Sequence, residues 1–213
     1  MTLIATPLKL MTALALALGV SACASVPNDT VTRNAPLDGP KQVMPIMLNV
    51  QSIKVDVPRT LVVSEENRYY PGGDIVWRED PMGDRYAQVE AIFTAAMTRG
   101  TAGMKAGVPV ELDIEVKRFH ALTQKTRYST GGVHALTFVM VLRDPATGVA
   151  LSEPRQITAN LKGYGGRKAV EAEQRGETQK VRITQHLAGV IQKEMTQPGS
   201  YQAANLGLMG MMN

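Results

Sequence analysis

The stretch Val110–Arg118, VELDIEVKR, carries the clearest structural pattern in the chain. Its apolar members are Val110, Leu112, Ile114 and Val116, and its polar members are Glu111, Asp113, Glu115 and Lys117. A period of two places the two sets on opposite faces of a strand, so we predict a half-buried strand with one solvated face. The acidic side chains could alternatively form a metal or acid–base site. A hard cation would also need oxygen ligands that converge from other segments, and the sequence shows none.

Further strand patterns lie on both sides of this stretch. We predict strands within Met44–Val57 and at Ile75–Trp77, a central strand covered on both faces at Val133–Arg143, and an interrupted strand made of Val149–Leu151 and Ile157–Leu161. The turns Ser129–Gly132 and Asp144–Gly148 connect the last three strands. Short turns join antiparallel neighbours, so these three strands are expected to form a meander.

Two amphipathic helices complete the predicted fold. The first runs from Asp84, a favourable N-cap residue, to about Gly103, and the second covers about Lys168–Met195. The expected buried stripe of the second helix consists of Val181, Thr184, Leu187, Ala188 and Ile191. The order of elements predicts an α+β fold, with an antiparallel sheet of about five strands and two helices packed on one face.

The N-terminal stretch Leu10–Cys23, LMTALALALGVSAC, is typical of a secretion signal. Its apolar run is shorter than the roughly 20 residues that span a bilayer. The run ends in Val20-Ser21-Ala22-Cys23, which resembles the lipobox of bacterial lipoproteins. We therefore predict cleavage between Ala22 and Cys23, and diacylglyceryl and acyl (palmitate-type) lipids on Cys23, the sole cysteine. The alternative is an ordinary signal peptide with small residues at its cleavage site.

Composition divides the chain into four segments. We expect a lipoprotein signal peptide at 1–22, a lipid-anchored flexible tether at 23–42, a periplasmic α+β domain at 43–196, and a disordered or loosely docked Met/Gly-rich tail at 197–213. By analogy with enterobacterial sorting, Ala24 after the cysteine favours the periplasmic face of the outer membrane. The alternative is the periplasmic face of the inner membrane.

Charge and motif content exclude several classes of function. The net charge of +4 is spread along the chain without a dense basic cluster, so no nucleic-acid partner is expected. The histidines His120, His134 and His186 belong to no catalytic or metal-binding motif, and there is no phosphate loop. We therefore expect neither an enzyme nor a bound cofactor. Counted from the turn at Thr130–Gly132, His134 should face residues 127–129 of the neighbouring strand, and His120 should face residues 141–143.

Two groups of side chains are candidates for binding. The loop Glu65–Trp77 brings Tyr69, Tyr70 and Trp77 together as a candidate partner-contact surface, although Trp77 alternatively belongs to the core. The methionines Met44, Met47, Met209, Met211 and Met212 could bind Cu(I) through their thioethers, or could simply pack and lie in a flexible tail.

A family resemblance rests on three runs of sequence. These are Leu61–Ser64, Pro71–Pro81 (PGGDIVWREDP) and Gly83–Val89 (GDRYAQV). Together they resemble a small family of uncharacterised alphaproteobacterial lipoproteins, which implies no activity. The order of elements more loosely resembles auxiliary lipoproteins of envelope ABC transport and lipopolysaccharide-assembly systems. The expected function is a membrane-anchored, non-catalytic accessory or binding subunit with an envelope protein partner. The alternative is a periplasmic carrier of a metal or small ligand.

Overall fold

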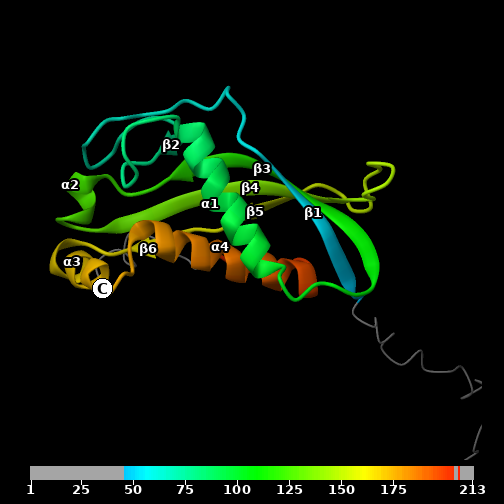
Figure 1. Cartoon of the computed structure of the whole chain (residues 1–213). Helices are drawn as coiled ribbons and strands as arrows, with labels where there is room; N and C mark the ends of the chain where they lie inside the picture. Colours follow the sequence, from blue (N-terminus) through cyan, green and yellow to red (C-terminus); the bar gives the residue numbers. More distant parts are fainter. Residues whose placement is uncertain (1–45, 204–205, 207–213) are drawn as a thin grey trace, which may run out of the picture. The chain divides into compact units, whose positions relative to one another are not determined.

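The part of the chain that the computed structural model describes, residues 46–203 and 206, contains both strands and helices. In order they are β1 (Leu48–Asp56), β2 (Ile75–Val76), α1 (Arg85–Gly100), β3 (Val108–His120), α2 (Gln124–Arg127), β4 (Gly132–Arg143), β5 (Arg155–Thr158), β6 (Leu161–Gly163), α3 (Gly166–Gln174) and α4 (Gln179–Thr196) (Figure 1). The fold is α+β, as predicted. The strand predicted at Val110–Arg118 is the centre of β3.

The sheet has six strands, in the order β1-β3-β4-β5, with β2 also beside β3 and β6 beside β4. The pairs β3–β4 and β4–β5 are antiparallel, which confirms the predicted meander. The prediction of a wholly antiparallel sheet of about five strands is wrong, because β1 and β2 both pair with β3 in parallel. The chain leaves the end of β1 and returns through α1 before it enters β3, and such a crossover joins strands that run in the same direction.

Helices α1 and α4 cover one face of the sheet, as expected (Figure 1). The α1 helix begins after Asp84, whose carboxylate accepts hydrogen bonds from the N–H groups of Tyr86 (3.0 Å) and Ala87 (3.2 Å). This confirms the predicted N-cap, which satisfies two of the unpaired donors at a helix start.

The prediction of one continuous helix at about Lys168–Met195 is wrong. The chain breaks it into α3 and α4, and Gly176 lies in the break with a φ of 79°. Thr178 then caps α4, its hydroxyl accepting from the Val181 N–H at 3.3 Å. Val181, expected in the buried stripe, lies in the first turn of α4 and is exposed, whereas Ile183 and Leu187 are fully buried.

Aromatic side chains join the helices to the sheet. The Phe93 ring of α1 lies between Phe119 of β3 and Phe138 of β4, with centroid distances of 6.1 and 5.6 Å. Trp77 packs edge-on against Phe119 at 5.6 Å. All four rings are fully buried, so the covered face of β3 and β4 holds the centre of the core.

The opposite face of the sheet carries the acidic side chains of β3. Glu111 accepts a hydrogen bond from the Ser52 hydroxyl (2.8 Å), Asp113 pairs with Arg143 (2.8 Å), and Glu115 pairs with Lys117. This is the polar face predicted from the alternation. The expectation that β4 is covered on both faces is wrong, because Ala135, Thr137 and Val139 on this side are half-exposed. None of the helices within residues 46–203 packs over them.

Parts of the predicted organisation lie outside the described residues. They are the signal peptide, Ala22, Cys23, the tether 23–42 and most of the tail. Residues 197–203 are described and contact α4: the Tyr201 N–H donates to Glu194 (2.9 Å), and the Tyr201 hydroxyl lies 3.4 Å from the His186 Nε2 atom. Residues 197–203 therefore lie against α4.

The contact between α1 and α4 gives a test with a matched control. A Cβ atom on Gly100, the last residue of α1, would lie 2.3 Å from the Ile191 Cγ2 atom and 2.4 Å from the Ala188 carbonyl oxygen. Gly100→Ala should therefore lower the free energy of unfolding by about 1–3 kcal/mol, because α1 must move away from α4. Urea denaturation followed by circular dichroism measures the change.

Gly189 on α4 provides the control. Nothing lies within 4 Å of a Cβ atom at this exposed position. Gly189→Ala should raise the free energy of unfolding by about 0.5–1 kcal/mol, since alanine loses less backbone entropy in a helix. If Gly100→Ala were as stable as Gly189→Ala, the close packing of the two helices would be wrong.

Candidate functional site

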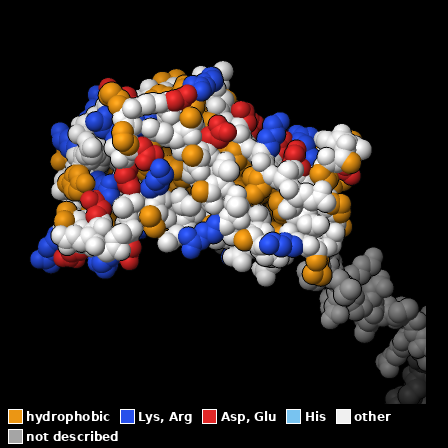
Figure 2. Space-filling model, in the orientation of Figure 1, with side chains coloured by type: hydrophobic (Ala, Val, Ile, Leu, Met, Phe, Trp, Pro, Cys, Tyr) orange, Lys and Arg blue, Asp and Glu red, His pale blue; other side chains and the backbone are white. Residues whose placement is uncertain are grey.

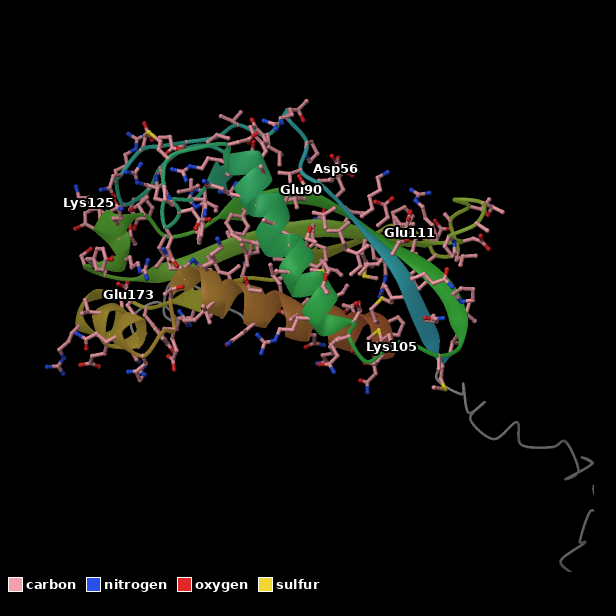
Figure 3. All side chains as sticks on the ribbon, viewed as in Figure 1. Asp56, Glu90, Lys105, Glu111, Lys125 and Glu173 are labelled. Atoms are coloured by element: carbon pink, nitrogen blue, oxygen red, sulfur yellow. The ribbon has the colours of Figure 1, made fainter. Side chains whose placement is uncertain are left out.

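A cavity of about 300 Å³ lies at the end of the sheet where β3 ends and β4 begins. It is lined by Tyr69, Tyr70, Pro71, Arg118, His120, Ala121, Leu122, Thr123, Thr126, Thr130, Gly131, Gly132 and Val133. The lining comes from three parts of the structure: the loop before β2, the segment containing α2, and the facing ends of β3 and β4. Figure 3 marks this end of the molecule by Lys125 on α2.

A β-bulge sets the floor of the cavity. The register between β3 and β4 shifts between Val116 and Arg118, so Lys117 is an extra residue in β3. Val116 faces the core, whereas Arg118 pairs with Thr137 and both are half-exposed. The bulge thus places Arg118 and His120 together on the uncovered face of the sheet.

Hydrogen bonds hold the wall of the cavity on this floor. The Thr123 hydroxyl donates to the Arg68 carbonyl (2.9 Å), and the Lys125 N–H donates to the Asn67 side chain (2.9 Å). The His120 Nε2 atom lies 3.1 Å from the Pro71 carbonyl oxygen, to which it donates. The backbone of the loop around Tyr69–Pro71 is therefore held at both sides of the cavity.

Only two of the three predicted contact residues are at the surface. Tyr70 is 90% exposed and Tyr69 is 43% exposed, and both line the cavity. Trp77 is fully buried against Phe119, and its indole N–H donates to Asp80 at 2.8 Å. Trp77 is thus a core residue, which removes it from the candidate contact surface.

The mouth of the cavity carries positive charge. Arg118 has neither an ion pair nor a side-chain hydrogen bond to any described residue. The Lys125 ammonium lies 4.8 Å from the centre of the Tyr69 ring. Burial is the main cause that lowers the pKa of His120 below its usual value, so this histidine is neutral at neutral pH. Arg118 is therefore the permanent charge on the floor of the site.

The histidine register expected from the sequence is wrong. His120 pairs with Ala135, and His134 pairs with Leu161 of β6. The turn at Thr130–Gly132 does not close a tight hairpin, because α2 lies between the two strands and shifts the register. His120 reaches the cavity on one face of the sheet, whereas His134 points into the other, buried side.

His134 is buried in its neutral form. Its Nδ1 atom accepts from the Leu122 N–H at 3.3 Å, so the proton of the ring resides on Nε2. The Nε2 atom is buried and has no hydrogen-bond partner among the described residues. Burial is the largest cause that lowers the pKa of His134 to about 3, and the nearby positive charges of Arg182 and Arg127 add to it.

Ion pairs fix α2 to the neighbouring segments. Arg127 is buried and pairs with Glu79 (2.8 Å) and with Glu173 of α3. Lys180 at the start of α4 pairs with Asp80 at 2.9 Å. A buried arginine is tolerated because two carboxylates compensate for its lost hydration. The support of the cavity is therefore rigid on the side opposite the loop.

The metal hypotheses concern the acidic side chains and five methionines. The described residues contain no cluster of three or more His, Cys, Asp or Glu side chains that could hold a metal ion. Among the candidate methionines, Met47 lines a separate groove of about 210 Å³ together with Met104 and Met195. Met44, Met209, Met211 and Met212 lie outside the described residues.

Sequence reasoning identified Tyr69 and Tyr70 but missed Arg118 and His120 as site residues. A signal was present, because the alternation of Val110–Val116 ends in two consecutive basic residues, Lys117 and Arg118. Such a break in period is typical of a bulge, which redirects the following side chains.

The surface and the helices add two general observations. Basic and acidic side chains are intermixed on the face drawn in Figure 2. Within residues 46–203, no helix is long and apolar enough to span a bilayer.

Comparison with known proteins identifies a family. Residues 48–211 match the model of a family of unknown function, DUF6778. No curated protein matches the chain.

Solved structures show a distant likeness. A candidate lipoprotein from Caulobacter crescentus has 15% identity over 50% of this chain and 80% of its own, with a TM-score of 0.29. A DUF330-family protein from Xanthomonas campestris has 14% identity over 70% of this chain and 87% of its own, with a TM-score of 0.36. The dodecameric PelC protein from Paraburkholderia phytofirmans has 18% identity over 70% of this chain and 90% of its own, with a TM-score of 0.32.

The buried histidine predicts how stability depends on pH. The folded-state pKa of His134, about 3, lies below the ordinary value of 6.5. Between these values the unfolded chain binds a proton that the folded protein does not, so the free energy of unfolding falls as pH falls. From pH 7 to pH 5, His134 alone should remove about 2 kcal/mol, measured by urea unfolding at both pH values.

The variant His134→Asn is the matched control. It retains an acceptor for the Leu122 N–H but has no titrating group, so it should lose about 2 kcal/mol less than the natural protein over the same interval. Burial also lowers the pKa values of His120 and His186, so part of the pH dependence should remain. An identical pH dependence in both proteins would refute the buried neutral state of His134.

Proposed function

We propose that this chain, which belongs to DUF6778, a family of unknown function, is a lipid-anchored envelope protein that faces the periplasm. The observation that carries the proposal is the sole cysteine, Cys23, which directly follows an apolar signal and two small residues. Two or more acyl chains on one cysteine anchor a protein stably, at about 0.8 kcal/mol per buried methylene. The outer membrane is the proposed location, since Ala24 and not an aspartate follows the cysteine.

The domain then acts as a non-catalytic accessory or binding subunit of an envelope transport or assembly system. Support comes from Tyr70 and Tyr69, which are exposed on a loop that hydrogen bonds hold to α2 and β3. Aromatic side chains on a fixed loop contribute contact area at little cost in conformational entropy. We propose them as the contact to an envelope protein.

A second function, the carriage of a small ligand, is favoured by the cavity beside the same tyrosines. Its volume of about 300 Å³ and its mixed lining of apolar groups with one arginine are characteristic of small-molecule sites. The other predicted carrier chemistry, a metal held by methionines, would involve Met47 as the one candidate methionine among the described residues.

Lipidation can be tested at Cys23. In the full-length protein, Cys23→Ser should leave residue 23 without acyl groups and block the cleavage before it, because the lipid is attached to the thiol before the signal peptide is removed. Mass spectrometry of the N-terminal peptide measures both effects. If the natural protein is cleaved but carries no lipid on its N-terminal peptide, the ordinary signal peptide is favoured instead.

Sorting is tested by a neighbouring substitution. Ala24→Asp leaves the lipidated cysteine in place and should move the protein from outer-membrane to inner-membrane fractions of a sucrose gradient. If the natural protein already sediments with the inner membrane, the proposed location is wrong while the lipid anchor remains.

The partner contact is tested by removing the exposed rings. Tyr69→Ala with Tyr70→Ala should reduce recovery of the cross-linked envelope partner at least tenfold in a pull-down of the lipidated protein from solubilised envelopes. Val149→Ala with Leu151→Ala removes two exposed apolar side chains from the loop between β4 and β5 and serves as the control. Equal recovery with both double variants would exclude the tyrosine loop as the contact.

A further inference from the structure

We propose that the cavity beside Tyr69 and Tyr70 binds a small organic carboxylate, an apolar molecule with one negative charge. The Arg118 guanidinium holds the carboxylate, and the apolar part of the lining holds the rest of the molecule. This inference rests on the second proposed function, the carriage of a small ligand, and specifies the chemical class of that ligand.

The unpaired state of Arg118 is the first argument. Most arginines of the described part pair with a carboxylate, and Arg182 instead lies 3.6 Å from the Tyr164 ring and donates to a backbone carbonyl. Arg99 and Arg118 are the two without such a partner among the described residues. Arg99 is exposed on α1, whereas Arg118 is half-buried in the cavity. Burying a guanidinium without a partner costs free energy, because the group loses hydrating water and gains no hydrogen bond. Folding has already removed part of the water from Arg118, so an anion that binds there has less water to displace.

The bulge in β3 supports this assignment. If Lys117 were paired in regular register instead of being bulged, the side chain of Arg118 would follow the alternation of Val116 and point into the core. The bulge instead turns the guanidinium to the open face, next to the loop that forms the cavity wall. The bulge in the central strand β3 thus places one cation, Arg118, in this cavity.

The charged groups around the cavity favour a ligand with a single negative charge. Arg68 already pairs with Glu66 at 2.6 Å, and Lys125 lies outside the floor, over the Tyr69 ring. His120 donates its Nε2 proton to the Pro71 carbonyl oxygen and supplies no second cation. One guanidinium matches the planar fork of a carboxylate through two parallel hydrogen bonds. A phosphate dianion would require further donors or cations.

The other lining residues favour a ligand whose uncharged part is small and apolar. Alkyl and ring carbons line the cavity on several sides, from Tyr69, Pro71, Ala121, Leu122 and Val133. The volume of about 300 Å³ is at the lower end of the range for ligand sites, which excludes the two long chains of a phospholipid.

The site is formed in advance by close backbone contacts. Gly131, which lines the cavity, has a φ of 71°, and its N–H donates to the Thr126 carbonyl at 2.8 Å. A Cβ atom on Gly165 would lie 2.1 Å from the Gly131 nitrogen, so the two turns touch through their backbones. Binding to a preformed cavity costs little conformational entropy of the protein.

Calorimetric titration of the full-length lipidated protein in nanodiscs tests the inference, with empty nanodiscs as the blank. The probes are benzoate and hexanoate, each compared with its neutral amide, benzamide or hexanamide. We expect at least one carboxylate to bind tenfold or more tightly than its amide. Arg118→Gln should abolish this difference between carboxylate and amide, whereas Arg99→Gln, the other unpaired arginine, should leave both affinities unchanged.

A second variant tests the charge without touching the sheet. Tyr70→Glu places a carboxylate at the mouth of the cavity on a side chain that is 90% exposed, so folding should be unaffected. It should weaken carboxylate binding at least threefold more than it weakens amide binding, because only the carboxylate is repelled by the new charge. This variant gives the answer even if Arg118→Gln is unstable.

The outcomes separate the inference from the function on which it rests. Equal affinity for carboxylates and amides would overturn the anion selectivity while the carriage of small ligands stands. Binding of none of the four probes would overturn both. Tighter carboxylate binding that survives Arg118→Gln in a folded protein would place the anion elsewhere and also overturn the inference.

Discussion

The packing of Phe93 between Phe119 and Phe138 is the interaction on which the rest of the structure depends. These rings join α1 to the two central strands, at centroid distances of 6.1 and 5.6 Å, and Trp77 extends the cluster to the segment that follows β2. Edge-to-face rings contribute beyond the area they bury. With α4 lying against α1 at Gly100, the cluster covers one face of the sheet and leaves the other face without helices.

That asymmetry creates the place for a site. The uncovered face is polar along β3, where Asp113 pairs with Arg143. At the end of β3 the bulge brings Arg118 onto this face, and the loop at Tyr69–Pro71 folds over it. The same segment continues into β2 and Trp77, which is anchored in the core. The wall of the cavity is thus tied to the most stable part of the domain.

Charged groups, more than apolar packing, fix the far side of the cavity. Arg127 is compensated by Glu79 and Glu173, so α2, α3 and the segment after β2 meet at one buried guanidinium (Figure 3 shows Glu173 and Lys125 at this end). Such pairs add little net stability, but their geometry allows few alternatives. A helix of four residues has no stability of its own, and α2 depends on these contacts.

The sequence by itself determined the strands of the meander, the start of α1 at Asp84 and the polar face of β3, because alternation and capping are local properties of neighbouring residues. It also placed Cys23 in a lipobox-like context. Only the tertiary structure decided that β1 runs parallel to β3, that Trp77 is buried, that Gly176 divides the last helix, and that Arg118 and His120 meet Tyr69 and Tyr70 at one cavity. These facts depend on the register between strands and on contacts between residues about 50 positions apart, such as His120 with Pro71, and a one-residue bulge is enough to reverse the face on which a side chain lies.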